Sequence, residues 1–288
     1  MAKASVPTVR SRRLGTALRR FREQKSLTLE AACAGLERSL SSLSKAENGR
    51  TKLYSRDVRG MLDFYGVTDE RVREGLVTLA RDSHKRGWWD HYGDVLKSSY
   101  LDFISLEADA SAAAVRTFET VLIPGLLQTP DYARAIINAI PTLAGPLDVD
   151  QLVAVRMARQ EVLTRESPLR LWAILDEAAL RRQTGGRDTM RAQLRHLADT
   201  STAENIIIQV LPCATGAHAG LTGPFTILEF PVLADLDVVL VETLTSGLYI
   251  ESEDEIRRYN LVFNHLRMSA LSREDSHRLI NQIAKEQQ

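Results

Sequence analysis

Several features that mark other protein classes are missing from this chain. It has only two cysteines, Cys33 and Cys213, which lie far apart in the sequence. Two distant thiols provide neither a disulfide framework nor the paired ligands of a thiolate metal site. No apolar run reaches the roughly 18 residues that span a bilayer, and the basic start of the chain lacks the apolar core of a signal peptide. We therefore expect a cytoplasmic protein with no membrane partner.

The usual marks of catalytic sites are missing as well. No GxSxG elbow, no GxxxxGK[ST] loop and no HExxH or CxxC spacing occurs, and no two histidines are three or four residues apart. The histidines are His84, His91, His196, His218, His265 and His277. We therefore expect no enzyme, no cofactor and no metal. An enzyme fused to a second, non-catalytic domain stays as an alternative, because folding brings distant residues together.

The chain has no net charge, yet its charges are unevenly distributed. It contains 37 Lys and Arg against 37 Asp and Glu over 288 residues, a length that allows two domains. Residues 1–56 contain 13 basic and 4 acidic side chains, a surplus of nine that the rest of the chain cancels. Because basic side chains gather where a protein meets phosphates, this distribution predicts a nucleic-acid partner for the N-terminal part alone.

The stretch Thr28–Gly49, TLEAACAGLERSLSSLSKAENG, has the pattern of two short helices joined by a tight turn. Thr28 and Ser39 are suited to cap the two helices. Apolar residues recur at helical spacing on one seam: Leu29, Ala32, Cys33, Leu36, Leu43 and Ala46. The pattern favours a helix-turn-helix, whose second helix fits the major groove of DNA, over an ordinary helical hairpin.

Together with the following residues 47–52 (ENGRTK), this unit resembles the DNA-binding domains of phage-repressor-like regulators of the xenobiotic-response-element class. The resemblance covers about the first 70 residues. The sequence departs from that family at Glu37, where the turn usually has glycine, and at Ala46, where a larger aliphatic residue is usual. Since a non-glycine residue in a left-handed turn costs on the order of 1 kcal/mol, Glu37 makes the turn less favourable.

The resemblance implies that the helix beginning at Ser39 enters the major groove of double-stranded DNA. The base-facing candidates are Leu29, Ser39, Leu40, Ser41, Ser44 and Lys45. The phosphate-binding candidates are Arg10, Arg12, Asn48, Arg50, Thr51 and Lys52. Because one helix reads too few bases to be selective in a genome, we expect a homodimer on an inverted repeat, held together mainly by the C-terminal domain.

The pattern of apolar residues predicts four segments. These are a flexible arm at 1–11, a helix-turn-helix domain of five short helices at 12–82, an aromatic-rich junction at 83–110, and an α+β effector and dimerisation domain at 111–288. Short, β-branched segments predict strands at Val115–Val121, Leu169–Leu175, Asn205–Leu211, Phe225–Phe230 and Asp237–Thr243, and a long helix is expected over Asp148–Glu166. The expected fold is therefore an all-α N-terminal domain followed by an α+β domain with a small, mostly antiparallel sheet.

From about Trp88 onward the sequence resembles the effector domain of actinomycete regulators of the WhiJ type, which are described as antitoxin-like. The resemblance rests on the segments PGLLQT at 124–129, RMARQ at 156–160, LDEAALR at 175–181, QVLP at 209–212 and GPF at 223–225. It implies a transcriptional regulator, repressing or antitoxin-like, that a small partner protein encoded nearby controls through this domain. A small-molecule effector that binds a pocket in the domain is the alternative.

Seven residues are candidates for contact with that partner or ligand. They are Trp88, Trp89, Tyr92, Arg156, Arg159, Glu177 and His218. The aromatic residues either join two domains or form a wall of a binding site. The arginines share one helical face, and with Glu177 or Glu107 they form a buried network or bind an anion. His218 belongs to a glycine-bounded loop that either closes over a ligand or connects two elements.

Overall fold

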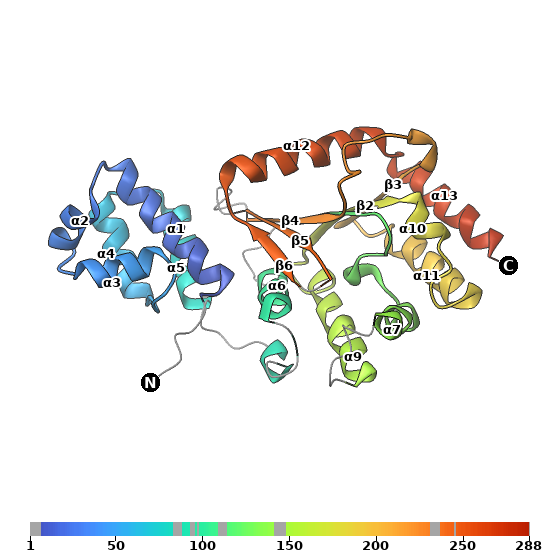
Figure 1. Ribbon diagram of the computed structural model, residues 1–288, viewed down its shortest axis with the longest axis horizontal. Coiled ribbons are helices and arrows are strands. Elements are labelled where there is room, and N and C mark those ends of the chain that lie inside the picture. Colours follow the sequence, from blue (N-terminus) through green and yellow to red (C-terminus); the bar gives the residue numbers. More distant parts are fainter. Residues whose placement is uncertain are drawn as a thin grey trace. The chain divides into compact units, whose positions relative to one another are not determined.

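The computed structural model describes residues 7–82, 88–92, 96, 98–108, 114–140, 148–230, 237–244 and 246–287 (Figure 1). It divides into two compact units, one built on five helices that end at Asp82 and the other on a six-stranded sheet. None of the helices in these ranges is long and apolar enough to cross a membrane.

The first unit consists of five short helices. They are α1 (Val9–Gln24), α2 (Leu29–Gly35), α3 (Leu40–Glu47), α4 (Ser55–Tyr65) and α5 (Glu70–Asp82). Hydroxyl side chains cap the first three, because Thr8, Thr28 and Ser39 each accept a hydrogen bond from a backbone N–H of the first turn. α1 begins at Val9, so the helix starts before the end of the arm that the sequence predicts to reach residue 11.

One apolar core holds these helices together. The buried side chains include Leu18, Leu43, Met61 and Leu76, which come from α1, α3, α4 and α5. α1 and α3 approach each other at Gly15, where a Cβ atom would lie only 2.5 Å from the carbonyl oxygen of Glu47. Glycine at this position therefore allows the two backbones to pack directly against each other.

The second unit is built on a mixed sheet with the strand order β3-β2-β1-β4-β5-β6. The strands are β1 (Ala114–Glu119), β2 (Arg170–Asp176), β3 (Ile206–Leu211), β4 (Phe225–Glu229), β5 (Val238–Glu242) and β6 (Gly247–Ile250). β2 pairs in parallel with β1 and β3, and the pairings β1–β4, β4–β5 and β5–β6 are antiparallel. Helices connect the parallel strands, because a parallel pair needs a long crossover.

Helices surround this sheet. They are α6 (Ser98–Ala108), α7 (Pro130–Ala139), α9 (Val149–Arg159), α10 (Glu177–Arg181), α11 (Arg187–Thr200), α12 (Glu253–Ser269) and α13 (Arg273–Glu286), with short 3-10 turns η2 (Gly125–Leu127), η3 (Gln160–Leu163) and η4 (Cys213–Thr215). A further 3-10 turn, η1 (Trp88–Tyr92), lies where the chain passes from the first unit to the second. α12 covers one face of the sheet (Figure 1), where Phe263 packs against the rings of Phe225 and Trp172. Side chains alternate along a strand. Phe118 of β1 therefore faces α12, and its neighbours Thr117 and Glu119 face the other side.

The structure confirms the expected fold class, a helical helix-turn-helix region followed by a region of helices and a sheet. All five expected strands occur with shifted ends, and β6 is an additional edge strand. The helix expected over Asp148–Glu166 ends at Arg159 and continues as a 3-10 turn. The side chain of Gln160, at this change, donates hydrogen bonds to the carbonyl oxygens of Gly125 and Gln128.

Candidate functional site

The turn between α2 and α3 has a left-handed backbone conformation, although this sequence lacks the glycine that the resembled family usually has there. Glu37 has φ +51°, in the region that favours glycine. The backbone N–H of Arg38 donates to the carbonyl oxygen of Cys33, which is the hydrogen bond of a Schellman motif at a helix C-terminus. Glu37 therefore ends α2 and directs the chain into α3 at the energetic cost of a side chain in this conformation.

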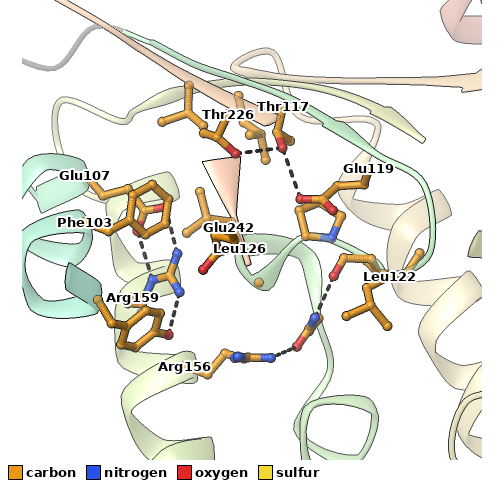
Figure 2. Close-up of a pocket in the computed structure, with 17 residues that line it drawn as sticks. Phe103, Glu107, Thr117, Glu119, Leu122, Leu126, Arg156, Arg159, Thr226 and Glu242 are labelled. Carbon is orange, nitrogen blue, oxygen red and sulfur yellow. Dashed lines mark hydrogen bonds and ion pairs between the residues drawn. The ribbon is translucent and has the colours of Figure 1, made fainter. Parts of the chain in front are cut away.

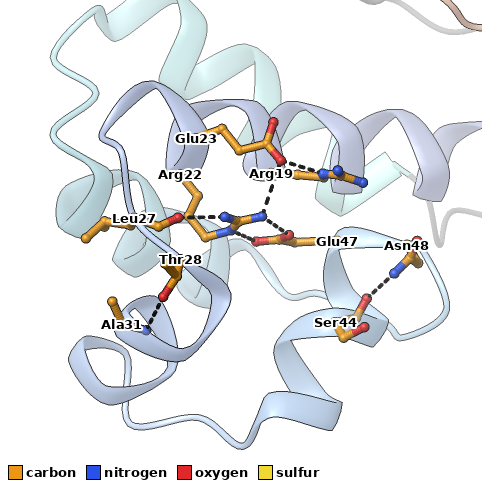
Figure 3. A network of polar contacts seen from close by, with 9 residues as sticks. All are labelled: Arg19, Arg22, Glu23, Leu27, Thr28, Ala31, Ser44, Glu47 and Asn48. Atoms are coloured by element: carbon orange, nitrogen blue, oxygen red, sulfur yellow. Dashed lines mark hydrogen bonds and ion pairs between the residues drawn. The ribbon is translucent and has the colours of Figure 1, made fainter.

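A buried ion pair fixes α3 against α1. Figure 3 shows the guanidinium of Arg22 facing the carboxylate of Glu47, with Nε and Nη2 donating to Oε1 and Oε2 at 2.7 and 2.9 Å. Arg22 also donates to the carbonyl oxygen of Leu27 at 2.7 Å, just before α2. Hydrogen bonding to Glu47 raises the pKa of Arg22 above its ordinary value. This network joins α1 and α3 and the start of α2 in one rigid arrangement.

The outward face of α3 carries most of the base-facing candidates. Ser39, Ser41 and Lys45 are exposed, Leu40 has an exposed fraction of 49%, and Ser44 is half-buried. Ser39 uses its hydroxyl oxygen to accept the capping hydrogen bond from Ser42. The last candidate, Leu29, is half-buried and packs against the core of the unit.

The phosphate candidates lie in different surroundings. Asn48, Arg50 and Lys52 are exposed and Thr51 is half-buried in the loop after α3. Asn48 donates from Nδ2 to the carbonyl oxygen of Ser44 at 2.7 Å (Figure 3).

Arg10 and Arg12 lie in the first turns of α1 rather than in a free arm. Arg12 donates to the carbonyl oxygen of Pro7 at 2.8 Å. Arg10 has an exposed fraction of only 6% and donates to the carbonyl oxygen of Asp82 at 2.9 Å. The guanidinium of Arg10 is therefore mostly buried against the helical unit, and a phosphate contact by this residue stays a prediction.

The second unit contains a pocket of about 120 Å³ between the sheet and the segments α6, η2 and α9 (Figure 2). Its sheet side is formed by side chains of β1, β2, β4 and β5, and its other side by aromatic, aliphatic and charged residues. The lining residues used below are Tyr100, Glu107, Thr117, Glu119, Leu122, Leu126, Gln128, Arg156, Arg159, Thr226 and Glu242.

Two arginines of α9 form one wall of this pocket. Arg159 donates to both carboxylate oxygens of Glu107, at 2.9 and 2.8 Å, and to the hydroxyl of Tyr100 at 2.7 Å. Burial is the largest single effect and lowers the pKa of Arg159, but the charges and hydrogen bonds of Glu107 and Tyr100 together outweigh it and raise that pKa above its ordinary value. Arg156 donates to Oε1 of Gln128 at 2.8 Å. Of the two carboxylates expected beside these arginines, the structure therefore brings Glu107 to Arg159.

The other sequence candidates of the effector domain lie outside the pocket lining. Glu177 pairs with Arg181 at 2.6 Å and accepts from the backbone N–H of Cys213. The His218 ring contacts Phe118, and its Nδ1 accepts from the backbone N–H of Gly220 at 3.2 Å. These contacts hold the glycine-bounded loop against the unit rather than directing His218 into the pocket.

The aromatic residues of the junction segment lie in different surroundings. The rings of Trp88 and Trp89 pack edge to face with centroids 5.9 Å apart. Tyr92 ends the same 3-10 turn, and its side chain lies outside the described part of the chain. Tyr100 and Phe103, which come from α6, line the pocket.

Sequence reasoning missed two carboxylates, those of Glu119 and Glu242. Both lie at strand ends and line the pocket (Figure 2). Burial, and then the negative charge of Glu242, raise the pKa of Glu119 to about 8, although the hydroxyl of Thr117, 3.2 Å from Oε1, lowers it. The one sequence feature that could have located them is the alternation of side chains along a strand. It puts each glutamate on the same face of the sheet as the apolar or hydroxyl residue two positions earlier.

Two family models match the chain. Residues 13–75 match a helix-turn-helix domain, which suggests a DNA-binding regulator and points to a regulator rather than to an enzyme. No curated protein and no solved structure matches. Residues 100–282 match a domain of unknown function, DUF5753, over more than half of the chain. The protein therefore belongs to the DUF5753 family, as a member with an N-terminal helix-turn-helix domain.

Proposed function

We propose that this protein is a transcriptional regulator of the xenobiotic-response-element type that inserts α3 into the major groove of DNA. The observation that carries the proposal is the exposed face of α3, on which Ser41 and Lys45 stand free of the core while Arg22 and Glu47 hold the helix from behind. A rigid helix with an exposed polar face at its N-terminal end is the geometry that reads base edges.

The roles of individual side chains follow from their chemistry. Lys45 donates to the O6 and N7 acceptors of guanine, the serines bond to several bases, and Leu40 contacts the methyl group of thymine. Arg50 and Lys52, both exposed in the loop after α3, bind the flanking phosphates. With so few base-reading groups, specificity also depends on DNA shape and on the spacing of two half-sites.

The protein acts as a homodimer on an inverted repeat, with the second unit providing the dimer contact. One feature of that unit supports this part of the proposal. Leu261 and Met268 have exposed fractions of 59% and 70% and lie seven residues apart on α12, on one face of the helix. Large apolar side chains exposed on one helical face are typical of an interface between protein chains.

Control of DNA binding passes through the second unit. The sequence allows two candidates for the signal that controls DNA binding, a small partner protein and a small molecule. A formed pocket with both charged and apolar lining residues favours the small molecule. A partner protein that docks on the exposed surface remains the second candidate, supported by the same apolar residues of α12.

The docking of α3 is tested by gel-shift titrations of the full chain on an operator selected from random DNA. We expect Lys45→Ala to cost about 1–3 kcal/mol of binding and to relax the base preference at one position. Arg50→Ala weakens binding to all sequences and lowers the steepness of the salt dependence by about one counterion. Arg71→Ala, which removes an exposed arginine from α5, is the matched control. Unchanged binding by both test variants would show that α3 does not dock in this way.

A further inference from the structure

The glutamates and arginines that line the pocket of the second unit are not paired one to one. Glu107 is neutralised by Arg159 through two hydrogen bonds. Glu119 and Glu242, in contrast, form no ion pair with any residue in the described ranges, although both line the same pocket. Glu242 is exposed to water, whereas Glu119 is half-buried, so Glu119 is the carboxylate that is costly to keep charged without a cation nearby.

The sheet register explains how these carboxylates come together. Thr117 of β1 lies beside Thr226 of β4, which lies beside Leu240 of β5. Glu119 and Glu242 each follow two residues later on strands that run in the same direction, so both project from the same end of the same face. The strand between them begins only at Phe225. Because neighbouring strands are about 4.8 Å apart, the two backbones are roughly 10 Å apart, which leaves space for a ligand group between the carboxylates.

Charged and titratable groups surround Glu119, but in the described ranges no cation pairs with its carboxylate. Its pKa is raised to about 8 by burial and then by Glu242. The other charged or titratable groups around it are Glu107 and Tyr100 on α6, Tyr132 on α7, and Arg156 and Arg159 on α9. Of the two arginines, Arg159 is engaged by Glu107 and Tyr100, and Arg156 donates to Gln128.

The remaining lining indicates an organic cation rather than a metal ion. In the described ranges no three His, Cys, Asp or Glu side chains gather as metal ligands. The aliphatic residues Leu122 and Leu126 line the pocket beside the carboxylates (Figure 2). A volume of about 120 Å³ lies below the roughly 300–1,000 Å³ of sites for drug-sized ligands, so the occupant is a small molecule of a few carbon atoms.

We propose that this pocket binds a small organic amine, with its ammonium group held between the carboxylates of Glu119 and Glu242 and its alkyl part against Leu122 and Leu126. The hydroxyls of Thr117 and Thr226 lie 3.0 Å apart beside the ammonium position, and the Thr117 hydroxyl orients Glu119 by donating to its Oε1 at 3.2 Å. Ammonium binding restores the charge of Glu119, because a nearby cation favours the ionised carboxylate. Binding is a property of the second unit, and only its effect on the operator depends on the proposed function.

Ligand binding is tested on the full chain with n-butylamine, 1,4-diaminobutane and 4-aminobutanoate, and with butan-1-ol as the neutral control. Saturation-transfer NMR detects binding and a titration gives the dissociation constant. We expect at least one amine to bind and butan-1-ol not to bind. Glu242→Gln weakens amine binding at least about tenfold, because one of two charge-assisted contacts is lost. Glu204→Gln, an exposed glutamate outside the pocket lining, leaves it unchanged.

The pH dependence separates this site from non-specific attraction of cations. From about pH 6 to pH 8 the affinity for the amine rises at least about tenfold as Glu119 ionises, and Glu119→Gln removes that rise. Thermal unfolding of each variant checks that the pocket is folded. The inference is overturned if no amine binds, or if binding is the same in Glu119→Gln, Glu242→Gln and the unmodified chain.

The regulatory consequence has its own measurement. We expect the bound amine to change the affinity of the full chain for its operator, and Glu242→Gln to abolish that change while operator binding without amine persists. An amine that binds but leaves operator affinity constant would overturn the regulatory role of the site. Loss of operator binding in Lys45→Ala tests α3 alone, so failures of the two proposals are distinguishable.

Discussion

At the scale of single residues, the ion pair between Arg22 and Glu47 fixes α3, the helix that we propose reads DNA, against α1. Both side chains are nearly fully buried, with side-chain exposed fractions of 9% and 4%, so water cannot replace either partner. The pair Arg19–Glu23 in the same helix has a similar contact distance of 2.7 Å but exposed fractions of 59% and 51%. The two pairs therefore differ in burial rather than in geometry.

This difference predicts unequal costs for two similar substitutions. Glu47→Ala removes the doubly hydrogen-bonded counter-charge of the buried Arg22 guanidinium and leaves only the exposed Glu23, 3.6 Å away, so we expect a loss of about 3–5 kcal/mol in the free energy of unfolding. Glu74→Ala, the control in the same unit, removes an exposed ion pair with Arg59 that is worth less than about 1 kcal/mol and does not touch Arg22. Urea unfolding of the helical unit in the full chain measures both. Equal small losses would mean that the buried pair does not stabilise the packing of α1 against α3.

The raised pKa of Glu119 makes the stability of the folded protein depend on pH. Its pKa in the folded protein is raised from 4.5 to about 8, so the folded state binds a proton more tightly than the unfolded state does. The stability that this proton contributes is complete below about pH 4.5 and is lost as the pH rises through about 8.

We therefore expect the unfolding temperature of the second unit to fall between about pH 5.5 and pH 8.5, and Glu119→Gln to flatten that part of the profile. The amide keeps the neutral form that the buried site favours. Calorimetry of the full chain measures the profile, with Glu204→Gln as the control for a change of net charge. A decline of the same size in Glu119→Gln would assign the pH dependence to other groups.

At the scale of elements, the helix ends show how local chemistry determines the helix-turn-helix. α1, α2 and α3 are each followed by a residue with positive φ, namely Ser26, Glu37 and Gly49. Glycine is free of strain in this conformation, whereas a residue with a Cβ atom is not. Of these three positions, only Gly49 has glycine, the residue that this conformation favours.

The turn at Glu37 gives a prediction that isolates backbone strain. Glu37→Gly and Glu37→Ala both remove the carboxylate, but only glycine relieves the left-handed conformation. We expect the glycine variant to be more stable than the alanine variant by about 1 kcal/mol in the free energy of unfolding. Chemical unfolding of the two proteins, compared in one buffer, measures the difference. Equal stability would show that the cost of φ +51° at this position is relieved elsewhere.

Elements with strong local signals could be predicted from the sequence. The hydroxyl caps at Thr28 and Ser39 and the five β-branched segments locate α2, α3 and the strands β1 to β5. β6, Gly247–Ile250, has only four residues and lies at a sheet edge, so its pattern is too short to identify. Arg10 looked like a free basic residue because its acceptor, the carbonyl oxygen of Asp82, is 72 residues away in the sequence.

The pocket could not be predicted because it depends on strand order. Glu119 and Glu242 lie far apart in the chain and meet only because β1 and β5 both flank β4. Spacing on one helix, in contrast, is visible in the sequence, and it identified Arg156 and Arg159 as neighbours. Which carboxylate joins Arg159 depends again on the tertiary fold, and the structure selects Glu107.

At the scale of the whole molecule, the uneven charge corresponds to a division of roles between the two units. The basic surplus of residues 1–56 belongs to the unit that carries α3, and the acidic remainder contains the pocket with Glu119 and Glu242. The N-terminal part attracts phosphates, and the carboxylates of the C-terminal part attract a cation. We infer that the two units bind ligands of opposite charge and that dimerisation connects the two events.

A dimer on an inverted repeat makes DNA binding depend on half-site spacing. In such a dimer the two copies of α3 enter the major groove on one side of the helix, about one turn apart. Inserting about 5 base pairs between the half-sites moves one of them to the opposite side, and inserting about 10 brings it back to the first. We expect the first insertion to lower affinity at least about tenfold in gel-shift titrations and the second to restore part of it.

The double substitution Leu261→Glu and Met268→Glu tests whether α12 provides the dimer contact. Charged side chains in an apolar interface oppose association, so sedimentation is expected to show a monomer. The monomer loses affinity for the intact inverted repeat but binds a single half-site as the unmodified chain does, because α3 is unchanged. Affinity that is insensitive to half-site spacing would contradict the dimer. A variant that remains dimeric would place the contact elsewhere in the second unit, and spacing would then still determine affinity.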